Sequence, residues 1–326
     1  MSELAAIVLA AGKSIRMKSD LPKVLHETCG RPMLSYVLNA CRLTGVDRLI
    51  VVVGYGKDKV IDRFAAEADV TWVDQTQQKG TGHAVLCCRN ELEGLAEDGS
   101  VLVIAGDMPL IRRETLANLV QSRSRSGHAV TIATTVLDDP TGYGRIVRDE
   151  QGNLAAIVEE VDCTAEQREI REVNPSYYCF DPSRLFGALD DVQPSGSKGE
   201  YYVTDAIRIL RANGCSVSAD VSVPSEDAMG INSRLDLAAI NRVMQDRIQL
   251  ALMDEGVTIV DPDNTWIEAE ASIGRESIIN PFTVIGAGST IGEGCRIGPF
   301  ARVAPGETIE DGAVVGPAAF DGVPTS

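Results

Sequence analysis

Aromatic residues are scarce in this sequence, at 5%, so Val, Ile, Leu and Ala carry most of the apolar content. A chain built on aliphatic side chains favours an α/β architecture with buried parallel strands. The hydrophobic fraction of 44% is enough for a sizeable core and excludes disorder as the default state. A length of 326 residues suggests two domains, or one large domain with an appendage.

Positive charge is also in short supply. Thirty Lys and Arg against 47 Asp and Glu give a net charge of −17 and an isoelectric point near 4.6. Such a surface repels polyanions, so we expect neither nucleic acid nor a membrane as a partner. An anionic nucleotide would need a local basic cluster. One short stretch, which holds only Asp20 and Glu27 as acids, supplies Lys13, Arg16, Lys18, Lys23 and Arg31.

Metal-site and export signals are missing too. There are only three histidines, and the eight cysteines show no CxxC spacing, which excludes a structural zinc site of the common kinds. We therefore expect reduced thiols in a cytoplasmic protein. The apolar N-terminal run has no basic residues before it, so it predicts a buried first strand rather than a signal peptide. Apolar runs of about 18 residues, as a membrane span requires, are absent.

The first 130 residues alternate apolar runs with helical patterns. We expect strands over 5–9, 49–53, 71–73, 101–105 and 130–135, and helices over 33–44, 57–66, 82–90 and 112–123. Pro32 suits the first helical position before Met33, and Thr81 suits the N-cap before Gly82. This alternation predicts right-handed βαβ crossovers and a Rossmann-like, mostly parallel sheet. Ligands on such sheets bind beyond the carboxyl ends of the strands, here after Leu9, after Ala105 and around Gln75.

The middle of the chain is less regular. We expect paired strands over 143–148 and 154–160, a strand over 174–180 and a helix over 204–212, together folding over the sheet as a further layer. Residues 234–253 have apolar side chains at three- and four-residue steps, which predicts a helix of roughly 30 Å. We interpret it as the connector to a second domain.

The last segment repeats every six residues. Aliphatic residues recur without a slip at Ile267, Ile273, Ile279, Ile285, Ile291, Ile297, Val303, Ile309 and Val315. Hexapeptide repeats of this kind predict a left-handed parallel β-helix, in which three hexads make one triangular coil and the aliphatic side chain points inward. The predicted domains are 1–232, a linker helix over 233–256, a short β-helix over 257–320 and a tail over 321–326.

The motif over residues 9–17 ends the first strand in small residues and Gly12. Its free backbone N–H groups could approach a phosphate, Arg16 could clamp phosphate oxygens and Lys23 would add a point charge. An ordinary strand-to-loop turn with surface basic residues is the alternative. Neither GxxxxGK[ST] nor GxGxxG occurs in the sequence, which disfavours P-loop kinases and dehydrogenases.

Two more motifs follow predicted strands. Residues 75–84 (QTQQKGTGHA) hold Gln75, whose amide has a donor and an acceptor that could contact a base edge. A polar loop with a helix cap explains the same residues and is the preferred interpretation of this segment alone. His83 suits packing inside the helix better than catalysis. Asp107, beside Gly106, is well placed to hold Mg²⁺ together with substrate phosphates. Asn232 alone would be interpreted as the N-cap of the long helix.

Taken together, these segments resemble sugar-nucleotide pyrophosphorylases. LAAGKSIRMKSDLPKVLHETCGRPML (9–34) is similar to the pattern LAAGxGTRMxSxxPKVLHxxxGxPM of GlmU-type N-acetylglucosamine-1-phosphate uridylyltransferases. The family patterns QxxQxGTxHA, GDxPL, TGYGRI, IVE, [EI]xN, GEYYxTD and GVN[DN]R have counterparts at 75–84, 106–110, 141–146, 157–159, 172–174, 199–205 and 230–234. The resemblance covers about residues 3–315.

The resemblance implies a role for each matching residue. Arg16 and Lys23 would act on the transferring phosphate, with Mg²⁺ held by Asp107 and Asn232. The nucleotide would be bound by Leu9, Ala10, Ala11, Gly12, Lys23, Gln75, Gly80 and Thr81. The sugar would be bound by Gly106, Gly144, Glu159, Asn174 and Asn232.

The implied reaction transfers a uridylyl group from UTP to N-acetylglucosamine 1-phosphate. We expect no acetyltransferase activity, because the family's segment for that second reaction lies on a longer β-helix, and we expect a homo-oligomer, a trimer through the β-helix. Several positions depart from the family patterns: Ser14-Ile15 replaces Gly-Thr, Ala105 a polar residue, Val161 a Lys, and Pro175-Ser176 [ST]-Gly. Another nucleotide–sugar pair and a non-catalytic nucleotide-sugar sensor therefore remain as alternatives. A purely structural β-helix scaffold would leave the loops of the first 230 residues unexplained.

Overall fold

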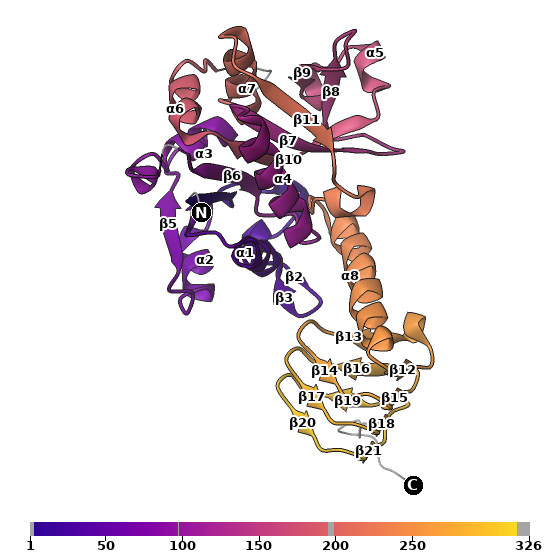
Figure 1. Ribbon diagram of the computed structural model, residues 1–326. Coiled ribbons are helices and arrows are strands. Elements are labelled where there is room, and N and C mark those ends of the chain that lie inside the picture. Colours follow the sequence, from indigo (N-terminus) through magenta and orange to yellow (C-terminus); the bar gives the residue numbers. More distant parts are fainter. Residues whose placement is uncertain (1–2, 97, 195–198, 318–326) are drawn as a thin grey trace. The chain divides into compact units, whose positions relative to one another are not determined.

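The computed structural model describes residues 3–96, 98–194 and 199–317 (Figure 1). The chain divides into two compact units, one formed by Met1–His26 and Met33–Arg234, the other by Glu27–Pro32 and Leu235–Ser326. The tail expected over 321–326 lies outside the described residues. The inclusion of residues 27–32 in the second unit is a feature that no sequence pattern indicated.

The first unit is built on one mixed sheet with the strand order β11-β7-β10-β6-β1-β4-β5, to which β8 and β9 attach through β10. The strands are β1 (Leu4–Leu9), β4 (Arg48–Val53), β5 (Val70–Asp74), β6 (Ser100–Ala105), β7 (Val130–Val136), β8 (Gly144–Arg148), β9 (Leu154–Val158), β10 (Glu172–Phe180) and β11 (Val217–Val221). Strands β6, β1, β4 and β5 run parallel to one another. Strand β10 runs antiparallel to β6, β7 and β8.

Helices cover both faces of this sheet, which explains why the central strands are apolar throughout. Those of the first unit are α1 (Met33–Thr44), α2 (Lys57–Arg63), α3 (Thr81–Leu86), α4 (Arg113–Ser126), α5 (Ala165–Arg168), α6 (Pro182–Asp190) and α7 (Val203–Ala212). Ala5 and Ile7 of β1 share a core with α3, α6 and α7. Because side chains alternate along a strand, Ala6 and Val8 face the side where α1 and α4 pack on the sheet.

The expected Rossmann-like α/β unit is confirmed, with local corrections. The strand expected over 174–180 does not belong to a separate layer, because β10 pairs with β6 and β7 within the sheet. The helix expected over 82–90 is shorter, because α3 ends at Leu86 and a separate turn covers 90–92. Thr81 is not the N-cap: Gly80 takes that position, and the Thr81 hydroxyl accepts a hydrogen bond from the Val203 N–H at 3.1 Å. Pro32 ends strand β3 (Arg31–Pro32) rather than starting α1.

The second unit contains the β-helix, with parallel sheets in the orders β12-β15-β18-β21, β13-β16-β19 and β14-β17-β20. Its strands are β12 (Thr258–Ile259), β13 (Thr265–Ile267), β14 (Ser272–Ile273), β15 (Ile278–Ile279), β16 (Thr283–Ile285), β17 (Thr290–Ile291), β18 (Arg296–Ile297), β19 (Arg302–Val303), β20 (Thr308–Ile309) and β21 (Val314–Val315). Ile267 pairs with Ile285, and Ile285 with Val303, so every third hexad stacks on the same wall. The expected triangular coil and its inward aliphatic column are confirmed.

Helix α8 (Arg234–Asp254) closes one end of this β-helix with two buried glutamines. The Gln245 amide both donates to the Ile267 carbonyl, at 2.5 Å, and accepts from the Ile267 N–H, at 2.9 Å. Gln249 donates to the Thr265 carbonyl at 2.9 Å. These bonds satisfy backbone groups of β13, which pairs with β16 on its other side.

The hairpin of β2 (Glu27–Thr28) and β3 packs in the same unit. The Cys29 N–H donates to Asn241 Oδ1 at 2.8 Å, and the Cys29 carbonyl accepts from the Ala269 N–H at 2.9 Å. A side chain at Gly30, where φ is +81°, would run into Glu268. These contacts explain why six residues next to the Lys23 segment group with the second unit.

Candidate functional site

The loop after β1 leaves the sheet beside two neighbouring strands. Leu9 pairs with Val52 of β4 and with Ala105 of β6, so the 9–12 segment lies at their carboxyl ends. The Gly106 N–H donates to the Leu9 carbonyl at 2.9 Å, and a side chain at Gly106 would crowd that carbonyl. Ser14 has a φ of −85°, so the replacement of glycine there introduces no left-handed strain.

The 75–84 segment is held by the part of the chain that follows residue 199. The Gly82 N–H donates to the Tyr201 carbonyl at 2.7 Å, and the Tyr201 N–H to the Lys79 carbonyl at 2.8 Å. Gly80 has a φ of +107°, and a Cβ there would lie 2.6 Å from the Tyr201 carbonyl. Glycine is therefore required at position 80 both for its backbone conformation and for this close approach.

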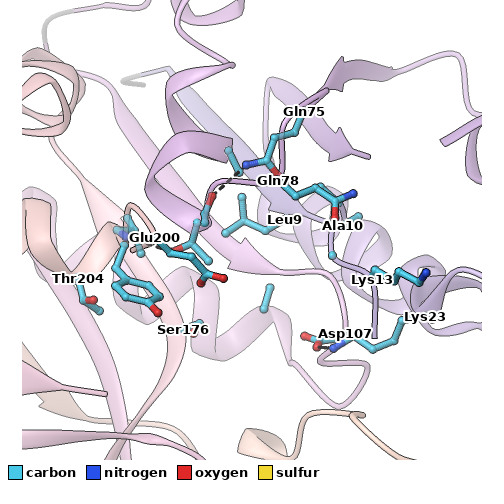
Figure 2. Close-up of a pocket in the computed structure, with 18 of the residues that line it drawn as sticks. Leu9, Ala10, Lys13, Lys23, Gln75, Gln78, Asp107, Ser176, Glu200 and Thr204 are labelled. Carbon is cyan, nitrogen blue, oxygen red and sulfur yellow. Dashed lines mark hydrogen bonds and ion pairs between the residues drawn. The ribbon is translucent and has the colours of Figure 1, made fainter. Parts of the chain in front are cut away.

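Lys23, Asp107 and Asn232 meet although they lie far apart in the sequence. The Lys23 ammonium contacts the Asp107 carboxylate and lies 3.2 Å from Asn232 Oδ1 (Figure 2 shows the first pair). The Ile231 N–H donates to the Asp107 carbonyl at 3.1 Å, which ties the two segments together. The Ser14 hydroxyl donates to the Asn232 carbonyl at 3.3 Å.

This donor set suits a divalent cation. The Asp107 carboxylate and the Asn232 side-chain oxygen both contact the same positively charged group, the Lys23 ammonium. Magnesium takes one or two protein oxygens and completes its shell with phosphate and water. Among the described residues there is no cluster of three or more His, Cys, Asp and Glu that could hold a metal alone. The arrangement therefore fits an ion that arrives with a phosphorylated substrate.

Glu159 lies at another side of the site, after the end of β9. Its carboxylate is buried, and this burial raises the pKa of Glu159 above its usual range. The Thr204 hydroxyl opposes that rise by donating to Glu159 Oε1 at 3.2 Å. Nearby, the Asn174 amide donates to the Tyr178 hydroxyl at 2.6 Å and accepts from the Ser176 N–H at 3.0 Å. These polar groups could accept and donate to sugar hydroxyls.

The 9–12 loop, the 75–84 segment, the Lys23–Asp107 pair and the Glu159 region together line a cavity of about 470 Å³ (Figure 2). Its lining includes most of the residues that the sequence singled out, namely Leu9, Ala10, Ala11, Gly12, Lys23, Gln75, Gly80, Thr81, Asp107 and Glu159. Four others, Gly106, Gly144, Asn174 and Asn232, do not line the cavity but adjoin residues that do. The Gly106 N–H donates to the Leu9 carbonyl, and Gly144 lies near Glu159. Asn174 is hydrogen-bonded to Tyr178, and Asn232 to Lys23. Arg16 is exposed on the turn over 15–17 and does not line the cavity, so the structure does not bring it to the other residues.

Several lining residues were not assigned from the sequence. They are Lys13, Val24, Gln78, Ala84, Ser176, Tyr178, Glu200, Tyr202, Val203 and Thr204. A signal existed for the last group, because residues 199–205 carry the GEYYVTD segment. Tyr178 had none, since nothing local distinguishes it from a core tyrosine of β10.

The departures from the family pattern fall in different places. Ala105 lines the cavity, whereas Val161 is 59% exposed and does not. Ser176 lines the cavity with a φ of +66°, in the left-handed region, at a register shift in β10 between Val173 and Tyr177. The glycine replacement that creates backbone strain is therefore the one at Ser176, not the one at Ser14.

No helix in the described part of the chain has the length and hydrophobicity needed to cross a membrane.

Comparisons with known proteins agree with this arrangement. The model of the MobA-like NTP transferase domain matches residues 6–203, and that of the bacterial transferase hexapeptide (six repeats) matches 270–305. The chain is 44% identical over 285 residues to the Bifunctional protein GlmU of Caldanaerobacter subterraneus subsp. tengcongensis, and 45% identical over 285 residues to that of Heliobacterium modesticaldum. Each match covers 87% of this chain and 61% of the relative, so the chain spans about three fifths of their length.

Among solved structures, one from Bacillus anthracis, described as a glucose-1-phosphate thymidylyltransferase in complex with a sucrose, has a TM-score of 0.62. It is 16% identical and the match covers 74% of this chain and 96% of that one, so it supports the fold alone. The match to the family model covers more than half of the chain, including the segments that line the cavity. The chain therefore belongs to the MobA-like NTP transferase family, and its repeats and sequence make it a relative of the GlmU proteins.

Proposed function

We propose that this protein transfers a uridylyl group from UTP to N-acetylglucosamine 1-phosphate, giving UDP-N-acetylglucosamine and pyrophosphate. The observation that carries the proposal is the convergence of Lys23, Asp107 and Asn232 beside the 9–12 loop. That cluster puts a fixed positive charge and two metal-type oxygens where the phosphates of a bound nucleotide would lie. The choice of uracil and of N-acetylglucosamine rests on the motif resemblance.

In the proposed reaction, a phosphate oxygen of the sugar 1-phosphate attacks the α-phosphorus of UTP. The bond from the α-phosphorus to the bridging oxygen breaks, and pyrophosphate leaves with that oxygen. Mg²⁺, when bound by Asp107 and Asn232, would neutralise developing charge on the phosphates. The chain's own contribution is placement and charge: the backbone of 9–12 approaches the nucleotide and Lys23 faces its phosphates. We expect Arg16, which is exposed, to join them only if its turn over 15–17 moves when substrate binds.

The opposite part of the cavity would hold the sugar. Glu159 and Thr204 are already hydrogen-bonded to each other and line it, with Tyr178 and Ser176 alongside. Asn174 would act mainly by orienting the Tyr178 hydroxyl. Because Val161 is exposed away from this lining, we expect its replacement of Lys to affect sugar binding little.

The first test is pyrophosphate release with Mg²⁺ across a grid of nucleoside triphosphates and sugar 1-phosphates. Release confined to UTP with N-acetylglucosamine 1-phosphate would support the proposal. Release with a different pair would keep the reaction type but change the assigned substrates. Ala105 lines the cavity where the family has a polar residue, which favours a changed substrate over a changed reaction. Binding of a UDP-sugar without release from any pair would show a sensor and overturn the proposal.

Two further parts of the proposal concern the hexapeptide unit and the location. We propose that the 326-residue chain does not transfer acetyl groups, although its relatives are named bifunctional; consumption of acetyl-CoA with glucosamine 1-phosphate would contradict this. We also propose assembly into a trimer through the hexapeptide unit, which sedimentation velocity would test. A cytoplasmic location agrees with the cysteines, all of which lie in the described ranges as free thiols.

A further inference from the structure

The amide of Gln75 is held by two protein acceptors. Its Nε2 lies 2.9 Å from the Gly80 carbonyl oxygen and 3.0 Å from His83 Nδ1. A backbone carbonyl can only accept a hydrogen bond, so the amide end that faces it must be the NH₂ group. The orientation of the Gln75 amide is therefore fixed by the chemistry of its neighbours, since the flipped amide would set two oxygens against each other.

His83 uses the second hydrogen of that NH₂ group. An amide nitrogen has two hydrogens, and the Gly80 carbonyl takes one. For the other to be donated, His83 Nδ1 must be unprotonated, which requires the neutral ring with its proton on Nε2. Burial, and then the charge of Lys79, lower the pKa of His83, so the neutral ring prevails at neutral pH. The Cys87 thiol, 4.0 Å from Nδ1, is also compatible with an acceptor there.

With both hydrogens used, the Gln75 side chain can offer a ligand only its oxygen. Gln75 lines the cavity, and Figure 2 shows its amide nitrogen at the dashed hydrogen bond, with the oxygen at the other side of the amide. In the part of the chain that the structure describes, no protein group donates a hydrogen bond to the Gln75 side-chain oxygen. A base that contacts Gln75 must therefore present a hydrogen-bond donor.

We propose that His83 is a positioning residue for base selection: it holds Gln75 so that the amide oxygen accepts from the imino N3–H of uracil and rejects cytosine. In the pose that brings N3 of the base to the Gln75 oxygen, cytosine presents an acceptor instead of the N3–H of uracil, so no proton lies between the two atoms. This inference rests on the proposed nucleotidyl transfer, and it adds a residue that, together with the Gly80 carbonyl, sets the polarity of base recognition. If His83 only packed within α3, its replacement would weaken the binding of UTP and CTP to the same extent.

The test compares His83→Phe with His83→Gln. Phenylalanine keeps a ring of similar size but removes the acceptor, and glutamine restores an acceptor oxygen. We expect His83→Phe to lower the ratio of kcat/KM for UTP over CTP about five- to tenfold, the size of one hydrogen bond, with kcat at saturating UTP nearly unchanged. His83→Gln should recover most of the ratio. Asn90→Ala, at an exposed position after the end of α3, is the control and should leave the ratio unchanged.

Calorimetric binding of UTP and CTP to the same variants separates this inference from the proposed reaction. If the wild type turns over no substrate pair but binds UTP more tightly than CTP, and His83→Phe narrows that difference, the reaction is wrong and the role of His83 stands. An unchanged binding ratio in a folded His83→Phe variant would overturn the role of His83. A wild type that binds CTP as tightly as UTP would overturn it as well.

Discussion

The two units of this chain encode their structure in opposite ways. In the hexapeptide unit, residues that stack on one wall are eighteen positions apart and chemically alike, as Ile267 and Ile285 show. In the first unit, residues that meet at the site are chemically different and come from distant segments, as Lys23, Asp107 and Asn232 do. Repetition therefore builds a core from one kind of residue used many times, whereas the site depends on single residues that each occur once.

The strongest test of this difference between the two units is to remove one of the residues that occurs only once in the site. Asp107→Ala should lower turnover at least about a thousandfold, because it removes the only carboxylate that we assign to the ion, whose charge contributes several kcal/mol. Pyrophosphate release in saturating Mg²⁺ is the measurement. Asp138→Ala, a change at an exposed carboxylate, serves as the control. Near-normal turnover of the Asp107 variant would remove this residue from the metal site.

A second change probes the repeated core. Ile279 is fully buried in the aliphatic column, so Ile279→Ala should destabilise the unit by about 3 kcal/mol through lost burial and the cavity left behind. Urea unfolding would measure this, with Val314→Ala as the control, since Val314 is 76% exposed and should change stability by less than about 0.5 kcal/mol. Equal effects at the two positions would show that the hexad column is not a core.

The smallest expected effect separates two positions where the family has glycine. Ser176 has a φ of +66° and Ser14 a φ of −85°. Ser176→Gly should raise the free energy of unfolding by about 0.5 kcal/mol, because relief of the left-handed backbone outweighs the freedom that glycine adds to the unfolded chain. Ser14→Gly should lower it by about 0.5 kcal/mol because it adds freedom to the unfolded chain. Thermal unfolding of both variants is the measurement, and shifts of the same sign would contradict this account.

Much of the architecture could be predicted because it is written in local patterns. The apolar runs predicted β1, β4 and β6 to within a residue, and the six-residue period predicted the stacking of the coils. Part of the cavity lining could also be predicted from the sequence, because the carboxyl ends of parallel strands lie at one edge of the sheet. The rest depends on contacts between distant segments. The bonds from residues 79–82 to 201–203 replace the expected Thr81 cap, and no local signal encodes them.

The sequence also failed to predict the role of a residue that acts through another residue. His83 suggested helix packing because its partner, Gln75, is recognised only once α3 and the end of β5 are placed together. In the same way, the grouping of Cys29 with α8 depends on Asn241, more than two hundred residues away. Arg16 shows the reverse: a residue that fits a motif lies on an exposed turn, away from the cavity.

The two glutamines of α8 have a consequence for how the protein avoids aggregation. A coil at the end of a β-helix presents unpaired backbone groups that any extended chain could join, which is how solenoids and edge strands grow into fibres. On β13, Gln245 and Gln249 occupy the N–H and carbonyl of Ile267 and the carbonyl of Thr265. Because a helix cannot be extended by another strand, the amides that complete this coil also block edge-to-edge growth at that end.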